Sequence, residues 1–319
     1  MRVYRDGAME AAAPWQQSLR AGSSCDDVLA ALGASPGALA GQTLLLTGAT
    51  AGIGRALAAA LAPLGPTLVC GCRSEEKAEA LAEQLRPAGA PLFTPRLDLA
   101  DLRSVRTFAA EINARVSSGE WPPLRALVLN AGVMHQTSAV AFGEGGVEDT
   151  FGTNHLAHFH LTELLLPLLR AAAPSRVVVV GSHSHFGPLA TDKKPLGAEE
   201  RPWLEDAVYP SAEEGWGLRR GLAAYGSSKL ANTLFAAELH RREAGEHNRL
   251  RTTCLAGLRV TDGACRRWTW SLATARAGPS SCGRGTCRQS WRRRSWRGTG
   301  WMSARWRRCR RRWRHRSSR

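Results

Sequence analysis

The chain has 319 residues, enough for one large α/β domain or two smaller ones, and its formal net charge is +16. This charge is confined to one end, because 18 arginines and no acidic residue lie between Gly263 and Arg319. Residues 1–262 carry 25 basic and 27 acidic side chains, which excludes a polyanion-binding surface spread over the whole protein.

Neither a signal peptide nor a membrane-spanning segment is predicted, because no apolar run has the required length. The eight cysteines show no repeated metal-ligand spacing. Cys70 and Cys72 follow an apolar run and are expected to be buried free thiols, which favours a reducing compartment. We therefore expect a soluble cytoplasmic protein.

Alternating strand and helix patterns begin at Gly41 and are typical of a doubly wound parallel sheet. Residues 1–40 are rich in Ala, Gly and Ser and predict a partly disordered leader with one short helix, 26–32. Strands are predicted at 43–46, 67–70, 92–97, 126–129, 177–180 and 252–255. Helices are predicted at 55–64, 75–85, 102–116, 146–169 (broken or bent) and 224–243. The sequence thus predicts an α/β domain over 41–262, with the Pro-rich segment 186–222 as an insertion over the site.

A glycine-rich turn, Thr47-Gly48-Ala49-Thr50-Ala51-Gly52-Ile53-Gly54, follows the first predicted strand. Its glycines allow positive φ angles and a close approach of the main chain to a ligand. The helix that follows offers unpaired N–H groups and a partial positive charge at its N-terminus. The turn therefore predicts a cradle for a pyrophosphate.

Three motifs follow the turn in order: Asn130-Ala131-Gly132 after the fourth strand, Ser182 after the fifth, and Tyr225-Gly226-Ser227-Ser228-Lys229. Together the four motifs resemble those of the short-chain dehydrogenases/reductases. Leu97-Asp98-Leu99 and the segments 154–159 and 236–242 are similar to the retinol dehydrogenase and WW-domain-containing oxidoreductase branch. The resemblance runs from about Gly41 to about Thr261. It implies a Rossmann-type fold and an oxidoreductase that interconverts an alcohol and a carbonyl of a small lipophilic substrate, such as a retinoid or steroid.

Tyr225 and Lys229 lie four residues apart, so they would share one face of a helix, where the ammonium is expected to lower the phenol pKa. The resemblance implies that Tyr225 is the acid/base and that Lys229 also holds the nicotinamide ribose. Ser182 would orient the substrate carbonyl, with Ser184 as a competitor for that role. Asn154 would bend its helix and hold a water in a proton relay. The alternatives are a solvated helix face for Tyr225 and Lys229, a strand-end turn serine for Ser182, and a capping or backbone-bonded asparagine for Asn154.

Cofactor preference depends on the end of the second strand, Cys70-Gly71-Cys72-Arg73, which has no carboxylate for a ribose diol. The guanidinium of Arg73 suits a 2′-phosphate, and Arg55 could assist it, so NADP(H) is predicted in preference to NAD(H). The alternative for Arg73 is an ordinary surface residue. By resemblance, Asp98 would accept from the adenine amine, and Asn130 would border the adenine pocket. The full set of cofactor-binding residues that the resemblance implies is Gly48, Ala51, Gly52, Ile53, Gly54, Arg73, Asp98, Leu99, Asn130, Ala131, Gly132, Tyr225 and Lys229.

Five histidines, at positions 155, 158, 160, 183 and 185, lie near these motifs. None forms a His-x-x-x-His pair backed by a carboxylate in register, so no metal is predicted and core or pocket-wall roles are preferred. His183 and His185 alternate along a stretch that is expected to be extended, so they should not both face one site.

The family pattern stops after the sixth strand, where Ala256 stands in place of an expected proline while Gly257 and Thr261 remain in register. Residues 263–319 contain one leucine and no isoleucine or valine, and predict a disordered tail. The sheet is therefore expected to lack its last strand and covering helices. A catalytically impaired protein that binds the cofactor or serves by interaction is the alternative function.

The Arg/Trp-rich tail allows two interpretations. It could bind nucleic acid or an anionic membrane through charge and stacking. It could instead be the product of a shifted reading frame, since its repeated Ser-Trp-Arg, at 290–292 and 295–297, becomes Glu-Leu-Glu in a neighbouring frame. The shifted frame is the preferred interpretation, and the sequence makes no prediction of oligomeric state.

Overall fold

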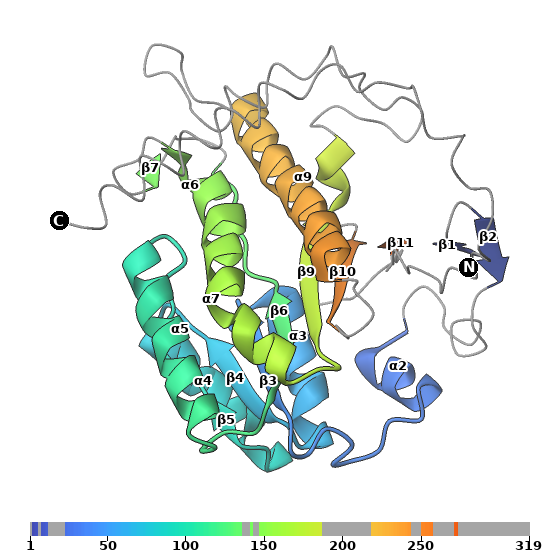
Figure 1. The fold of residues 1–319 in the computed structure, drawn as a ribbon, viewed down its shortest axis with the longest axis vertical. Coiled ribbons are helices and arrows are strands. Elements are labelled where there is room, and N and C mark those ends of the chain that lie inside the picture. The colour runs from blue at the N-terminus through green and yellow to red at the C-terminus, as the bar shows by residue number, and fades with distance from the viewer. Residues whose placement is uncertain are drawn as a thin grey trace, which may run out of the picture. The chain divides into compact units, whose positions relative to one another are not determined.

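The computed structural model describes residues 2–5, 8–11, 23–135, 141–142, 147–186, 218–243, 250–257 and 271–273. Seven strands form one sheet in the order β11-β10-β9-β6-β3-β4-β5 (Figure 1). They are β3 (Thr43–Thr47), β4 (Thr67–Gly71), β5 (Leu92–Phe93), β6 (Leu124–Leu129), β9 (Arg176–Ser182), β10 (Arg251–Gly257) and β11 (Ser271–Ala273). All pairings are parallel except that of β11 with β10.

Two antiparallel pairs lie outside this sheet: β1 (Arg2–Arg5) with β2 (Ala8–Ala11), and β7 (Ala141–Phe142) with β8 (Val147–Glu148). The chain divides into two compact units, Met1–Arg276 and Ala277–Arg319. The sheet belongs to the first unit. The second lies outside the described residues, as do residues 187–217 of the insertion predicted at 186–222 and most of the predicted tail.

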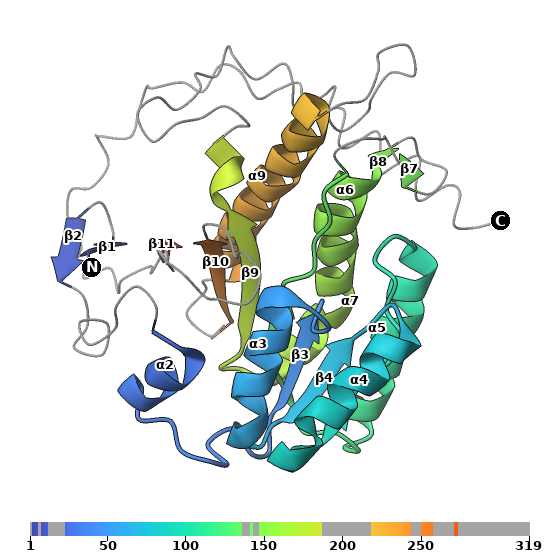
Figure 2. The same cartoon turned by 180° about the vertical axis from the view of Figure 1, so that it is seen from behind.

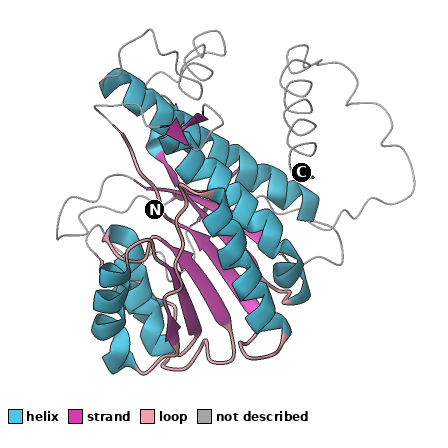
Figure 3. Ribbon diagram, turned by 90° about the vertical axis from the view of Figure 1, so that its left-hand side faces the viewer, coloured by secondary structure: helices cyan, strands magenta, loops and turns pink. Residues whose placement is uncertain are grey.

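Helices lie on both faces of the sheet (Figures 2 and 3). The main ones are α3 (Gly52–Leu61), α4 (Glu75–Leu85), α5 (Leu102–Ser117), α7 (Ala157–Ala171) and α9 (Leu218–Glu243). Shorter ones are α2 (Cys25–Ala31), η1 (Ala62–Leu64), η2 (Arg86–Ala88), α6 (Asp149–Phe151), η3 (Gly152–Leu156) and η4 (His183–Phe186). None of the helices in the described residues is long and apolar enough to cross a bilayer.

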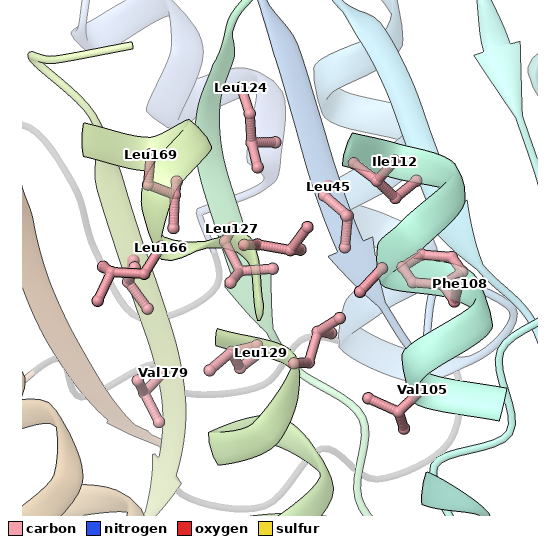
Figure 4. Packing of buried hydrophobic residues seen from close by; sticks show 14 of the residues in the cluster. Leu45, Val105, Phe108, Ile112, Leu124, Leu127, Leu129, Leu166, Leu169 and Val179 are labelled. Carbon is pink, nitrogen blue, oxygen red and sulfur yellow. The ribbon is translucent and has the colours of Figure 1, made fainter. Parts of the chain in front are cut away.

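Two hydrophobic clusters separate along the strands because successive side chains point to opposite faces of the sheet. In β3, Leu45 belongs to the cluster with α5, α7 and α9, whereas Leu44 and Leu46 belong to the cluster with α3 and α4. Figure 4 shows the first cluster, in which Phe108 and Ile112 of α5 pack near Leu45. The glycine turn and the Tyr225 helix are thus supported by different clusters.

Strand β9 is packed unequally on its two faces. Val177 and Val179 are buried in the cluster with α7 and α9. Val178 and Val180 alternate with them and are only half-buried. In the described part of the chain, the opposite face carries α3 and α4, whose cluster includes buried residues of β3, β4 and β6 but only the half-buried Val178 of β9.

Most of the predicted elements are present, and the predicted break in the helix over 146–169 is confirmed by its division into α6, η3 and α7. The third strand is confined to Leu92–Phe93, and α9 begins at Leu218 instead of residue 224. The six predicted strands form the parallel part of the sheet, and the tail, which was predicted to be disordered, adds the short antiparallel strand β11 beside β10. Antiparallel pairing uses backbone groups of an open edge and needs no apolar pattern, so composition did not reveal these three residues.

Candidate active site

The glycine turn lies between β3 and α3, at the carboxyl edge of the sheet. Gly48 has a φ of 69° and Gly52 a φ of 52°, which suit glycine. Gly54 was expected to share this freedom, but its role is close packing: a Cβ there would lie 2.1 Å from the Gly48 carbonyl oxygen. Ala51 and Gly52 at the start of α3 are exposed, Ile53 is half-buried, and a Cβ at Gly52 would meet nothing within 4 Å. The turn is therefore closely packed at Gly54 and open at Gly52, which we call its front.

Asn130 and Ala131 fix the turn from the neighbouring strand end. The Asn130 side-chain amide donates to the carbonyl oxygens of Thr47 (3.0 Å) and Gly48 (3.1 Å). The Thr47 hydroxyl accepts from the backbone N–H groups of Asn130 (3.0 Å) and Ala131 (3.1 Å). Asn130 was predicted to border the adenine pocket. In the structure its side chain packs against the glycine turn, through its bonds to Thr47 and Gly48.

Asn154 lies in η3, a π-type turn in which the Ala157 N–H bonds to the Gly152 carbonyl. Its side chain is fully buried, accepts from the Val133 N–H (2.8 Å), and donates to the Val133 carbonyl (2.9 Å) and Ser228 Oγ (3.1 Å). The segment is bent as predicted. The side chain has the backbone partners of the alternative interpretation, and it joins the segment after β6 to α9.

Ser182, Tyr225 and Lys229 converge where β9 meets α9. The Tyr225 side chain is hydrogen-bonded to Ser182, and Lys229 Nζ lies 5.5 Å from the Tyr225 ring centroid. Lys229 Nζ donates to the Val180 carbonyl (3.0 Å). Gly132 completes this corner, because a Cβ there would lie 3.3 Å from Asn154 Oδ1 and 3.5 Å from Lys229 Nζ. Ser184 is close as well, with its Oγ 3.2 Å from Ser182 Oγ.

The electrostatics differ from the expected effect of a lysine on a phenol. Burial raises the pKa of Tyr225, and the hydrogen bond to Ser182 only partly opposes that rise. Burial lowers the pKa of Lys229 to about 8. The predicted lowering of the Tyr225 pKa is therefore wrong for the protein alone, because removal of the phenol from water outweighs the hydrogen bond to Ser182.

The predicted adenosine end of the site is less enclosed. Arg73 and Arg55 are exposed, whereas Cys72 and Leu99 are buried. Asp98 Oδ1 accepts from the Ala100 N–H (3.0 Å), so one carboxylate oxygen holds its own loop. Among the described residues, Cys25, Cys70, Cys72 and Cys254 are free thiols, and burial raises the pKa of Cys70 and Cys72.

His155 and His185 have structural partners. His155 Nδ1 donates to Asn232 Oδ1 (3.0 Å), and His185 Nδ1 donates to the Ser182 carbonyl (2.6 Å). Residues 183–186 form a 3₁₀ turn, so the expected extended stretch is wrong. Within the described ranges, no group of three His, Cys, Asp or Glu side chains could hold a metal ion.

Four residues link the predicted ones, and sequence reasoning predicted no such role for any of them: Thr47, His158, Ser228 and Asn232. Of these, Asn232 alone was not named from the sequence. Asn232 donates to the Asn154 carbonyl (3.1 Å), and His158 bridges Thr47 and the same carbonyl. The spacing of Asn154 and His158, four residues apart on a helix, was the available signal. The approach of Thr47 to His158, which are 111 residues apart, had no signal in one sequence.

Comparison with known proteins relates part of the chain to a family. The sequence profile of the short chain dehydrogenases matches residues 42–191. Retinol dehydrogenase 14 of Mus musculus is 41% identical over 226 residues, which cover 67% of this chain and 60% of the relative. WW domain-containing oxidoreductase of Gallus gallus is 36% identical over 209 residues, covering 64% and 46%. The chain thus spans about 60% of the length of the retinol dehydrogenase 14 relatives.

Comparison with solved structures concerns the fold. An uncharacterized protein from Mycobacterium Paratuberculosis superposes with a TM-score of 0.53 at 33% identity, covering 73% of this chain and 72% of that one. The Pseudomonas aeruginosa RhlG/NADP active-site complex gives 0.51 at 25% identity, covering 71% and 76%. Residues 42–191 thus match the short-chain dehydrogenase family. Within it, the chain is similar to the retinol dehydrogenases and WW domain-containing oxidoreductases.

Proposed function

We propose that this chain is an NADP(H)-dependent oxidoreductase that interconverts the carbonyl and alcohol of a small lipophilic substrate, such as a retinoid or steroid. The observation that carries the proposal is the convergence of Tyr225, Ser182 and Lys229 at the carboxyl edge of the sheet. Ligands of doubly wound sheets bind at this edge. The turn at Gly48 lies at the same edge, where Thr47 ends β3.

The cofactor, when bound, supplies or accepts the hydride. In the reducing direction Tyr225 gives its phenolic proton to the substrate oxygen, and Ser182 donates a hydrogen bond to that oxygen. Lys229 would hold the nicotinamide ribose. Asn154 keeps the segment after β6 against α9 through its bonds to Val133 and Ser228.

The turn fits a nucleotide pyrophosphate. Its front is open at Gly52, and the start of α3 has no side-chain cap, so backbone N–H groups there are available to an anion. NADP(H) is preferred because the exposed Arg73 follows β4 where a carboxylate would select NAD(H). The NADP complex of the Pseudomonas aeruginosa neighbour supports this choice.

The test is cofactor-dependent reduction of retinal and of an aldehyde and ketone panel by the full chain, with NADPH and NADH compared. Tyr225→Phe should abolish turnover while NADPH binding, followed by the fluorescence of the bound dinucleotide, changes little. Leu234→Ala, at an exposed position of the same helix, is the matched control and should retain activity.

A second candidate, a cofactor-binding protein without turnover, is favoured by one observation. Ala256 replaces the proline that the family resemblance leads us to expect, and the family pattern ends after Thr261. NADPH binding with no hydride transfer to any member of the panel would support this candidate. Equal rates with NADH and NADPH would instead contradict the proposed cofactor preference.

A further inference from the structure

His158 is a fully buried residue of α7 that lies between the glycine turn and the Asn154 segment. Its Nε2 is 2.9 Å from the Thr47 hydroxyl, and its Nδ1 is 3.0 Å from the Asn154 carbonyl oxygen. Both partners belong to the proposed site, one at the end of β3 and the other in η3. No role in the proposed reaction accounts for this ring.

The partners determine the protonation state of the ring. A carbonyl only accepts hydrogen bonds, so His158 Nδ1 carries the proton and donates to Asn154. Nε2 of the neutral ring is then an acceptor, and the Thr47 hydroxyl must donate to it. Burial lowers the pKa of His158 to about 3, which agrees with a neutral ring.

The Thr47 hydroxyl has one proton and two lone pairs, and the neutral ring lets all three be used. The lone pairs accept from the N–H groups of Asn130 and Ala131, while the proton points to His158. Without the ring acceptor, the nearest alternative is the Val128 carbonyl at 3.4 Å, which is a longer bond. The ring therefore fixes the direction of the hydroxyl that holds the end of β6 against the turn.

We infer that His158 is a positioning residue that couples the nucleotide-binding turn to the Asn154 segment through these two hydrogen bonds. This inference rests on the proposed function, because the two places that it joins are the proposed cofactor and reaction sites. Loss of the ring leaves the Asn154 carbonyl with Asn232 as its remaining described side-chain partner and releases the Thr47 hydroxyl. Cofactor binding should then weaken although no side chain that would touch the cofactor has changed.

The first test is a double-mutant cycle on NADPH affinity with Thr47→Val and His158→Leu in the full chain. His158→Leu should weaken NADPH binding about tenfold, the effect of losing a buried hydrogen bond. Thr47→Val should weaken it further, because this change also removes the acceptor of the Asn130 and Ala131 N–H groups. The double variant should bind much more tightly than the product of the two effects predicts, because both remove the same contact. His158→Gln, whose amide can donate and accept, should recover part of the affinity.

Thr162→Val is the matched control. Thr162 is buried one turn further along α7 and its hydroxyl bonds to the His158 carbonyl, so the change costs a buried hydrogen bond without touching the ring. It should alter NADPH affinity less than about twofold. An equal loss in this variant, or additive effects in the cycle, would overturn the inference.

A second test needs neither variants nor cofactor. Nitrogen-15 NMR of the imidazole rings in the unmodified chain should give a protonated Nδ1 and an unprotonated Nε2 for His158 at neutral pH. A proton on Nε2, or a charged ring, would refute the proposed bonds. If the unmodified chain binds no NADPH, the proposed function fails, while the ring spectrum and the same cycle measured on unfolding free energy still decide the role of His158.

Discussion

The burial of Tyr225 should influence the preferred direction of the proposed reaction. Since burial raises its pKa, the phenol keeps its proton at neutral pH, where it can protonate a carbonyl but cannot accept a proton from an alcohol. We expect carbonyl reduction to be faster than alcohol oxidation near neutrality, and oxidation to keep rising into the alkaline range. Initial rates in both directions over a pH series would measure this. An oxidation rate that levels off near neutral pH would contradict it.

His158 should make stability depend on acidity. Its folded-state pKa of about 3 lies below the value of about 6.5 expected in the unfolded chain, so the unfolded state binds the proton first as pH falls. The stability that the neutral ring contributes is complete above about pH 6.5 and is lost as pH falls toward 3. Nearby Lys229 and His155 lower the pKa of His158 further, because positive charges on these side chains repel a proton on His158.

The measurement is urea unfolding at several pH values, with His158→Gln for comparison. The variant should be less stable at neutral pH but should lose less of its unfolding free energy on acidification. His155, whose pKa burial also lowers, remains in both proteins and contributes equally to their slopes. Parallel slopes for the two proteins would mean that His158 is already charged, or already exposed, in the folded chain.

At the scale of elements, the glycine turn should tolerate substitution very unevenly. Gly54→Ala puts a methyl group 2.1 Å from the Gly48 carbonyl oxygen, which neither backbone segment can avoid without shifting. We expect a loss of stability of about 1–3 kcal/mol, typical of an overpacked site, together with loss of NADPH binding. Thermal melting and dinucleotide fluorescence would measure the two effects.

Gly89→Ala is a suitable control for that substitution. Gly89 has a φ of 70° and ends η2, and a methyl group there would meet nothing within 4 Å. Its cost is confined to left-handed backbone strain of roughly 1–2 kcal/mol, so the melting temperature should fall while NADPH affinity is unchanged. Loss of NADPH binding in both variants would mean that Gly54 has no special place in the turn.

The sequence was a good guide where a pattern is local. Strand β3 and helix α4 have apolar runs or helix-forming stretches with clear boundaries, and they begin where predicted. The adjoining motifs predicted which residues meet at the carboxyl edge. Long-range geometry was not accessible: the desolvation that raises the Tyr225 pKa depends on everything packed around it. The contact of Thr47 with His158 likewise depends on how β3 and α7 pack.

At the scale of the whole molecule, the uneven packing of β9 has a consequence for solubility. Val178 and Val180 are half-buried on the face where the described helices are α3 and α4. Exposed apolar sheet surface promotes association, so we expect the purified chain to aggregate. Size-exclusion chromatography and calorimetry would measure this, and a sharp cooperative melt of a monomer would refute it.

A pair of substitutions tests the cause of that aggregation. Val178→Thr should raise the soluble fraction at a modest cost in stability, because its side chain is only half-buried. Val177→Thr, one residue away and fully buried on the other face, should lower stability by about 1–3 kcal/mol without improving solubility. If the two changes have the same effect on solubility, aggregation has another origin.

The division of the hydrophobic core between the two sheet faces also predicts how the protein opens. The glycine turn is supported by the cluster with α3 and α4, and the Tyr225 helix is supported by the cluster with α5, α7 and α9. Amide hydrogen exchange should therefore reveal two cooperative units with different opening free energies. A partly opened chain could keep its nucleotide turn while Tyr225 is displaced, so dinucleotide retention and turnover would fail at different denaturant concentrations.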